Sequence, residues 1–511
     1  MFKKVNSAAY SGLKSIGIDV EINTSKKGLP GFDIVGLPSK AVDESEERVK
    51  NAIMNSNVEL PSRKITVNLA PADVPKEGSF YDLPIAVGIL ASSLRFEIPE
   101  KSLFFGELSL DGSLRHTKGA LPLALYAKSE GYKNIFLPEE SANEAAVIKE
   151  IDVYPIKDLD QLISHLLKKA TVEPTEYEIK SQKEIEPEFD MSEILGQEQV
   201  KRAAEIAAAG GHNLFMIGSP GSGKTMIARA VPGILPPLSD EESLEVTKIY
   251  SISGNTSPGS GLIRKRPFRA PHHGISKVGL IGGGSRPKPG EVTLAHRGVL
   301  FLDEFNEFPR SALEAMRQPL EDGKLTISRS KERVSYPSGF MLISSSNPCP
   351  CGYLFHPEKE CDCTPRQVKR YQKKISGPIL DRIDLHVEVP SVDVEKLKRE
   401  RRADDNEKSK EIRKRVIGAR KIQEERFKSE SIRTNAEMKN RHVKKYCKIP
   451  EETEEMLSKA SSKFNLSARS YFKMIKVAQT IADLEKEKAI KSEHIGEALQ
   501  YRAKNSDDFS F

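Results

Sequence analysis

One eight-residue motif constrains the fold of this chain more than any other feature. Residues 218–225 read GSPGSGKT and fit the pattern G-x-x-x-x-G-K-[ST] at every fixed position. A short apolar run, residues 213–217, precedes the motif, and residues 226–230 (MIARA) suit a helix. This order of strand, glycine-rich loop and helix is what a phosphate-binding loop needs. It therefore predicts an α/β fold with a parallel sheet.

The residues of this loop predict how a nucleotide is held. The loop consists of Gly218, Ser219, Pro220, Gly221, Ser222, Gly223, Lys224 and Thr225. Its glycines let the backbone N–H groups surround a β-phosphate, and the following helix adds the positive end of its dipole. We expect Lys224 to reach the β- and γ-phosphates of ATP, and the Thr225 hydroxyl to bind Mg²⁺.

A second motif supplies the carboxylates that such a site requires. Residues 298–304 read GVLFLDE, a buried type of strand that ends in two acids. Asp303 suits a contact to Mg²⁺, and Glu304 suits the role of polarising the attacking water. Taken alone, this segment also fits an acidic strand end in solvent. Beside the phosphate-binding loop, the pair predicts ATP hydrolysis.

Length and composition indicate a soluble chain of several domains. With 511 residues there is room for about three domains. The longest nearly apolar run, residues 83–94, is too short to cross a bilayer, and no apolar segment follows Lys3 and Lys4 as in a secretory signal. Five cysteines in this length do not make a disulfide scaffold, so we expect the protein to lie in the reducing cytoplasm. Because no apolar run is long enough to cross a bilayer, we expect no membrane partner. The net charge of +6 does not identify a nucleic-acid partner.

Pattern changes along the chain predict three folded parts. Residues 1–172 are mixed α/β, with an alternating strand at 64–70, a hairpin around Asp111-Gly112, and a helix at 39–55 that has one apolar face. Residues 173–190, rich in Glu and Lys, form a linker by composition. Residues 191–391 hold the phosphate-binding core. Residues 392–511 are helical, with apolar positions that repeat near 3.6 residues.

Four of the five cysteines lie close together and suggest a metal site. Cys349, Cys351, Cys361 and Cys363 form the pattern C-x-C-x₉-C-x-C. Four thiolates close a tetrahedral Zn²⁺ site, although the C-x-C spacing is tighter than the usual C-x₂-C. The alternative is a set of reduced thiols that only pack. The fifth cysteine, Cys447, stands alone.

Several longer stretches resemble one family of ATPases. They are EIAAAGGHN (residues 205–213), PFRAPHH (267–273), GGGSRPKPGEVTLAHRGVLFLDE (282–304), SSSNPCPCG (344–352), SGPILDRID (376–384) and SARSYFKMIKVAQTIADLE (467–485). With the phosphate-binding loop, they resemble the AAA+ ATPases and, within them, the magnesium-chelatase-like branch known as the ComM/YifB family. The resemblance covers essentially the whole chain. It implies an AAA+ core that carries a C-terminal helical lid.

The resemblance also implies roles for three further residues. Asn347, after the strand at 340–345, resembles the sensor-1 residue that orients the attacking water. Arg382 resembles the arginine finger, which reaches the γ-phosphate bound by a neighbouring subunit. Arg469 resembles the sensor-2 arginine of the lid. The alternative for each arginine is an ordinary surface salt bridge.

Two segments of the core resemble pore loops of ring helicases. Residues 324–335 alternate around a polar tip and predict a β-hairpin, at the place where such helicases carry a pore hairpin. Arg329, Lys331 and Arg333 would then contact phosphates of a threaded DNA strand. The alternative is a solvated hairpin. Residues 263–290 resemble the helix-2 insert, a second pore loop, and we do not expect His272 and His273 to bind a metal.

The N-terminal part resembles the α+β catalytic domain of Lon proteases but lacks its chemistry. The resemblance lies in residues 75–78, 106–114 and 118–127. The position of the serine nucleophile falls on Phe80, with Ser79 one position away, and that of the lysine base falls on Leu121. A Ser–Lys dyad needs both partners, so we predict no protease activity. Similar domains in RadA-type recombination proteins imply DNA binding or ring packing instead.

The resemblance implies a ring, most simply a homohexamer, that uses ATP to move DNA. The specific expectation is branch migration during homologous recombination and natural transformation. The first alternative is a chelatase-like or chaperone-like ATPase that remodels a protein partner. The second is a binding module with a decayed ATPase, against which the intact Lys224, Asp303 and Glu304 argue.

Overall fold

The computed structural model describes residues 1–25, 29–36, 39–76, 78–177, 188–284, 287–328, 333–354, 356–391 and 406–503. The chain divides into two compact units. Unit 1 comprises Met1–Lys183 and Asp240–Ile263, and unit 2 comprises Glu184–Ser239 and Arg264–Phe511. Within the described ranges, no helix is long and apolar enough to cross a membrane.

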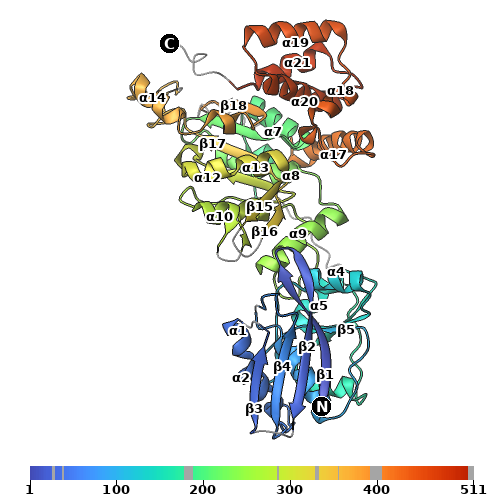
Figure 1. Ribbon diagram of the computed structural model, residues 1–511. Coiled ribbons are helices and arrows are strands. Elements are labelled where there is room, and N and C mark those ends of the chain that lie inside the picture. Colours follow the sequence, from blue (N-terminus) through green and yellow to red (C-terminus); the bar gives the residue numbers. More distant parts are fainter. Residues whose placement is uncertain are drawn as a thin grey trace. The chain divides into compact units, whose positions relative to one another are not determined.

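Unit 1 is built on a seven-stranded mixed sheet with the strand order β3-β4-β2-β1-β5-β8-β9 (Figure 1). The strands β1, β2 and β4 pair antiparallel, whereas β3 and the three later strands join in parallel. The strands of unit 1 are β1 (Phe2–Ser11), β2 (Lys14–Ser25), β3 (Gly31–Val35), β4 (Lys64–Ala70), β5 (Ser102–Phe104), β6 (Glu107–Leu108), β7 (Leu114–Arg115), β8 (Asn134–Pro138) and β9 (Asp152–Ile156). The predicted strand at 64–70 is β4, and the predicted hairpin is the antiparallel pair β6–β7.

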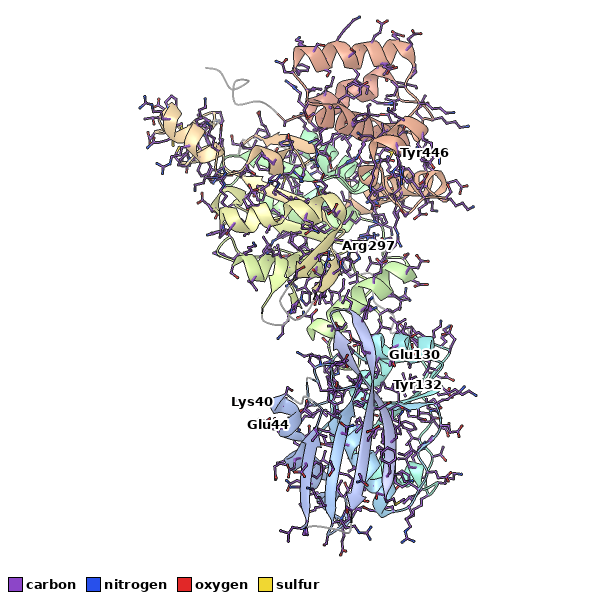
Figure 2. All side chains as sticks on the ribbon, in the orientation of Figure 1. Lys40, Glu44, Glu130, Tyr132, Arg297 and Tyr446 are labelled. Atoms are coloured by element: carbon purple, nitrogen blue, oxygen red, sulfur yellow. The ribbon has the colours of Figure 1, made fainter. Side chains whose placement is uncertain are left out.

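Unit 1 also contains helices. They are α1 (Lys40–Asp43), α2 (Ser45–Asn55), α3 (Asp82–Ser93), α4 (Ala120–Glu130), α5 (Glu139–Ala145), α6 (Leu159–Leu166) and α9 (Asp240–Ser253). The helix predicted at 39–55 is divided into α1 and α2; Figure 2 labels Lys40, the first residue of α1, and Glu44, the residue between the two helices. Its apolar face is confirmed, because Val42, Val49, Ala52 and Ile53 are all fully buried.

The second segment of unit 1 comes from the middle of the chain. We predicted residues 240–263 within the core domain, whereas the structure places them in unit 1. The helix α9 contacts α4, and Leu244 packs on an apolar cluster of unit 1. Ser251 also donates a hydrogen bond of 2.5 Å to the buried carboxylate of Glu144. The sequence pattern does not reveal this excursion, because the contacts join residues more than 100 positions apart.

Unit 2 contains the parallel sheet that the loop motif predicts. Its five strands are all parallel, in the order β11-β14-β17-β10-β18. They are β11 (Phe268–Arg269), β14 (Val299–Leu302), β17 (Met341–Ser346), β10 (Leu214–Gly218) and β18 (Leu385–Val389). Two short antiparallel pairs accompany the sheet: β12 (Gly282–Gly283) with β13 (Lys288–Pro289), and β15 (Lys324–Ser328) with β16 (Arg333–Pro337).

Both faces of this sheet are covered, as is usual for parallel sheets. Along β10, Leu214 and Met216 belong to one apolar cluster, whereas Phe215 belongs to the other. The helices of the core are α7 (Glu198–Gly210), α8 (Lys224–Ile234), α10 (Lys277–Ile281), α11 (Glu291–Leu294), α12 (Arg310–Ala315), α13 (Arg317–Asp322), α14 (Pro365–Gln372) and α15 (Gly377–Leu380). Successive side chains of β10 therefore lie on opposite faces of the sheet, and the sheet separates the core of unit 2 into two apolar layers.

The C-terminal part is helical and packs on one of these layers. Its helices are α17 (Ser409–Arg426), α18 (Asn440–Tyr446), α19 (Glu451–Lys463), α20 (Ala468–Leu484) and α21 (Ser492–Gln500) (Figure 1). The helix α17 contacts α7, α8 and α20. On α17 the apolar residues Ile412, Val416 and Ala419 are buried; Ile422 is only half-buried, and its neighbour Gln423 is fully buried. Gln423 lies there because its amide donates to the Ala209 carbonyl at 3.0 Å.

Candidate functional site

The phosphate-binding loop joins the end of β10 to the start of α8. Gly221 and Gly223 have φ values of +77° and +90°, and a Cβ atom at either would meet no other atom within 4 Å. These two positions therefore need glycine for the backbone conformation and not for space. At Gly218 the reason is space, because a Cβ there would lie 2.3 Å from the Val389 carbonyl oxygen.

Lys224 lies inside the curve of this loop. Its ammonium donates to the carbonyl oxygens of Gly218 at 2.7 Å and Ser219 at 2.8 Å. Burial lowers the pKa of Lys224 to about 8, while the nearby charges of Asp303 and Glu304 act in the opposite direction. The side chain is thus placed at the loop, as its motif predicts.

Parallel pairing brings Asp303 to this loop. Both β10 and β14 end at the same sheet edge, where open α/β sheets bind their ligands. The Thr225 hydroxyl donates to the Asp303 carboxylate at 2.7 Å, and the Ser345 hydroxyl at the end of β17 donates to its other oxygen. The two residues predicted to bind Mg²⁺ are therefore adjacent. The donor set, a hydroxyl and a carboxylate, fits that hard cation.

Glu304 follows Asp303 with a positive φ of 53°. Its exposed carboxylate lies 3.1 Å from Nδ1 of His273. The ring of His272 stands 4.0 Å from that of His273. Sequence reasoning considered these histidines only as metal ligands and missed the contact with Glu304. It depends on β11, which pairs with β14 and carries the following segment to that edge.

Asn347 is the first residue after β17, at the same sheet edge. The neighbouring Ser346 hydroxyl donates to the Asn306 side chain and to the Asn347 carbonyl oxygen. The strand ends of β10, β14 and β17 therefore present the loop, the two carboxylates and Asn347 together. This is the part of the predicted site that one chain assembles.

The two predicted arginines lie together but not at that edge. Arg382 donates to the Glu321 carboxylate, and its other nitrogen donates to the Pro378 carbonyl at 2.6 Å. Arg469, on α20, lies 3.7 Å from the second oxygen of Glu321. Among the described residues, neither arginine forms a hydrogen bond or ion pair with Lys224, Asp303 or Glu304.

Asn213, just before β10, fixes the backbone that carries Arg382. Its side chain donates to the Arg382 carbonyl at 3.0 Å and accepts from the Leu342 N–H at 2.8 Å. Its own N–H donates to Asp384 at 3.1 Å, and Lys473 on α20 donates to the Ile383 carbonyl at 2.7 Å. The arginine segment is therefore tied to two strands of the sheet and to the C-terminal helices. No sequence motif predicted that Asn213 would link the Arg382 segment to these strands.

Three family models match the chain in order. Subunit ChlI of Mg-chelatase matches residues 20–141, the magnesium chelatase subunit ChlI model matches 190–397, and the model of its C-terminal part matches 406–502. The competence protein ComM of Haemophilus influenzae is 40% identical over 505 residues, which cover 98% of this chain and 97% of that protein. The chain belongs to the ComM/YifB family.

Other relatives place this family near the chelatases. An uncharacterized protein YifB of Salmonella typhimurium is 41% identical and covers 98% of this chain and 96% of its own length. The magnesium-chelatase 38 kDa subunit of Rhodobacter capsulatus is 26% identical over 40% of this chain and 57% of its own length. Membership in this magnesium-chelatase-like AAA+ family, with the intact phosphate-binding loop, supports an ATPase.

This ComM/YifB chain gathers its four clustered cysteines at one point. The Sγ atoms of Cys349, Cys351, Cys361 and Cys363 all lie within 4.8 Å of one another. The first three are separated by 3.3, 3.5 and 3.7 Å, close to the ~3.8 Å edge of a tetrahedron with Zn–S bonds of ~2.3 Å. A hydrogen bond from the Tyr353 N–H lowers the pKa of Cys351 to about 6, whereas burial raises that of Cys349 to about 12. Four thiols in this arrangement fit a zinc ion.

In unit 1 the protease positions hold apolar side chains. Phe80 stacks on Phe105 with ring centroids 4.4 Å apart, and its edge contact with Tyr10 is at 5.6 Å. Leu121 is fully buried in an apolar cluster. The Ser79 hydroxyl donates to the Glu107 carboxylate, which is not a general base of the Ser–Lys type.

The predicted hairpin of the core is present as β15 and β16. Leu325, Ile327, Val334 and Tyr336 bury one face of it, and Arg333 is exposed. Arg329 and Lys331, which we predicted to contact DNA, lie outside the described residues.

Proposed function

We propose that this chain is an ATP-driven motor that works as a ring and acts on DNA. One observation carries the proposal: the sheet edge gathers Lys224, Asp303 and Glu304, while Arg382 is held elsewhere by Glu321. A neighbouring subunit that supplies its own Arg382 would complete the site. Such arginines accelerate hydrolysis by roughly 10³–10⁵-fold, so subunit contact would control ATP turnover.

Each residue of the site would have a separate role in ATP hydrolysis. The phosphate-binding loop and Lys224 bind the phosphates. Thr225 and Asp303 would hold Mg²⁺, which supplies positive charge to the phosphate oxygens. Glu304, kept in place by His273, would orient and polarise the attacking water, and Asn347 would orient that water from the neighbouring strand end. Arg469 would report the state of the nucleotide to the C-terminal helices, which act as the lid.

A mixing experiment tests whether the site is shared between subunits. Lys224→Ala removes phosphate binding and Arg382→Ala removes the arginine, so we expect each variant alone to hydrolyse almost no ATP. Mixed in equal amounts, the variants should regain about a quarter of the normal rate, because a quarter of random interfaces pair an intact loop with an intact arginine. No recovery in mixtures that form rings would contradict the shared site. Mass measurement with a non-hydrolysable ATP analogue tests the homohexamer.

The DNA part of the proposal has two supports. One is the name of the Haemophilus relative, a competence protein. The other is the hairpin β15–β16, where the exposed Arg333 begins β16 and follows Arg329 and Lys331 in the sequence. In the cytoplasm, ATP turnover would move such hairpins along DNA and drive branch migration. We expect branched or single-stranded DNA to stimulate ATP hydrolysis at low salt. We also expect branch migration to separate a synthetic four-way junction into two duplexes only when ATP is present.

A protein-remodelling ATPase is the alternative, and the chelatase matches favour it. The ATP site is the same in both cases, so DNA stimulation decides between them. If DNA leaves turnover unchanged and the triple substitution Arg329→Ala, Lys331→Ala and Arg333→Ala leaves DNA binding unchanged, the alternative stands.

Two smaller assignments complete the proposal. We propose that the four clustered cysteines bind a structural Zn²⁺, which metal analysis of purified protein tests directly. We also propose that unit 1 has no peptidase activity, because Phe80 and Leu121 offer neither a nucleophile nor a base. Its role would be DNA binding or ring packing.

A further inference from the structure

The cysteine cluster adjoins the ATP site directly. Cys349 comes two residues after Asn347, at the end of β17. From Asn347 to the start of α14 at Pro365, the described residues contain neither a helix nor a strand. Hydrogen bonds at this loop include one from the Gly352 N–H to the Cys349 carbonyl at 3.0 Å and one from the Gln372 side chain on α14 to the Pro348 carbonyl at 3.2 Å. A segment of this kind needs another means of support to keep one conformation.

One glycine of this loop packs against both parts of the nucleotide site. A Cβ atom at Gly352 would lie 2.6 Å from Cδ of Pro220, in the phosphate-binding loop, and 3.8 Å from Cγ of Asn347. Gly352 also has a φ of +84°, which other residues rarely adopt. The backbone at Gly352 therefore lies close to both the phosphate-binding loop and Asn347. It is bonded directly to Cys351, one of the four clustered cysteines.

We infer that zinc at the four cysteines holds Gly352 against Pro220 and Asn347, so metal loading sets the geometry of the ATP site. This inference rests on the proposed ATPase and zinc assignments and adds a coupling between them. Metal–thiolate bonds would cross-link Cys349 and Cys351 to Cys361 and Cys363 and so hold this loop in one conformation. Small displacements of catalytic groups cost large factors in rate, so a loosened Gly352 lowers ATP turnover.

Three variants of the full chain test the coupling. Cys363→Ser removes one thiolate at the exposed end of the loop, and Cys447→Ser is the matched control, since Cys447 lies outside the cluster. Gly352→Ala keeps all four thiols but places a methyl group against Pro220. We expect about one zinc per chain in the unmodified protein, the Cys447→Ser protein and the Gly352→Ala protein, and less than half as much in Cys363→Ser. ATP turnover should fall at least tenfold in Cys363→Ser and in Gly352→Ala, and stay unchanged in Cys447→Ser.

Amide hydrogen exchange gives a readout that does not need hydrolysis. Removing zinc with a selective chelator should speed exchange in the peptide that covers residues 214–226, and adding zinc back should restore protection. A zinc-loaded protein whose turnover and exchange both survive zinc removal would overturn the coupling, as would a purified chain with less than a tenth of a zinc ion. If the unmodified chain hydrolyses no ATP but its exchange still depends on zinc, the proposed ATPase fails and the coupling stands.

Discussion

Glu321 forms ion pairs with the two arginines, Arg382 and Arg469, that the family resemblance assigns to the ATP site of AAA+ proteins. The carboxylate belongs to α13 and is half exposed, whereas the Arg382 side chain is only 9% exposed. The hydrogen bond from Arg382 lowers the pKa of Glu321, so the carboxylate remains charged at neutral pH. Within one chain, the charged Glu321 carboxylate therefore binds Arg382. A phosphate that binds Arg382 would have to compete with this carboxylate.

We expect Glu321→Gln to raise the ATPase rate of the assembled protein. The substitution removes the competing charge and keeps the shape of the side chain. Because partly exposed ion pairs contribute at most ~1 kcal/mol, the gain should be about fivefold or less. Steady-state ATP hydrolysis measures it, and Glu411→Gln, which removes an exposed pair with Lys414, serves as the control. A lower rate in Glu321→Gln would mean that Glu321 orients Arg382 and does not restrain it.

Substitution of Glu304 should separate ATP binding from hydrolysis. Glu304→Gln leaves Lys224 and the loop intact, so we expect the affinity for ATP to remain within a few-fold of normal. Turnover should fall about 10²–10⁴-fold, the usual contribution of a general base. Nucleotide binding and single-turnover hydrolysis measure the two effects.

The contact of His273 with Glu304 leads to a prediction about the two residues in combination. His273→Ala should lower turnover in the unmodified protein because it leaves Glu304 without its 3.1 Å partner. In the Glu304→Gln background the same substitution should have no further effect, since residues that act through one another are not additive. An equal loss in both backgrounds would show that His273 acts independently of Glu304.

The stability of unit 1 should depend on one buried ion pair. Asp82 is fully buried and accepts hydrogen bonds from Arg48 at 2.6 and 3.1 Å. Arg48→Met leaves the buried carboxylate without its charged partner, so we expect a loss of roughly 3–5 kcal/mol in the free energy of unfolding. Denaturant titration measures it. Lys4→Met, which breaks the exposed pair with Asp19, should cost less than ~1 kcal/mol.

Unit 2 should become less stable below neutral pH because of His386. Burial lowers the pKa of this β18 residue to about 4, from a usual value of 6.5. As the pH falls from 6.5 to 4, the unfolded chain gains a proton on His386 that the folded chain does not accept. The cost reaches roughly 3 kcal/mol at pH 4 and does not grow below it. In His386→Gln the unfolding midpoint should therefore fall less steeply over this range, as thermal melts at each pH would show.

The sequence predicted the parts of the ATP site that lie on contiguous motifs. The loop at 218–225 and the strand at 298–304 each carry their own local signal of glycines, apolar run and polar end, so the parallel sheet followed from them. The hairpins around Asp111-Gly112 and over residues 324–335 were also predicted, because strand alternation around a turn is local. The contact between His273 and Glu304 was not, since it arises from the pairing of β11 with β14.

The sequence by itself determined the motifs of this protein: the glycine-rich loop, the carboxylates that follow the neighbouring strand, and the stretches that identify its family. Only the tertiary structure decided where those residues meet. Strand order brought three strand ends to one edge, and packing paired Arg382 with Glu321 and placed Gly352 close to Pro220 and Asn347. The physical reason is the separation of the residues along the chain. A motif consists of residues that are close in sequence, whereas packing brings together residues that are more than 100 positions apart.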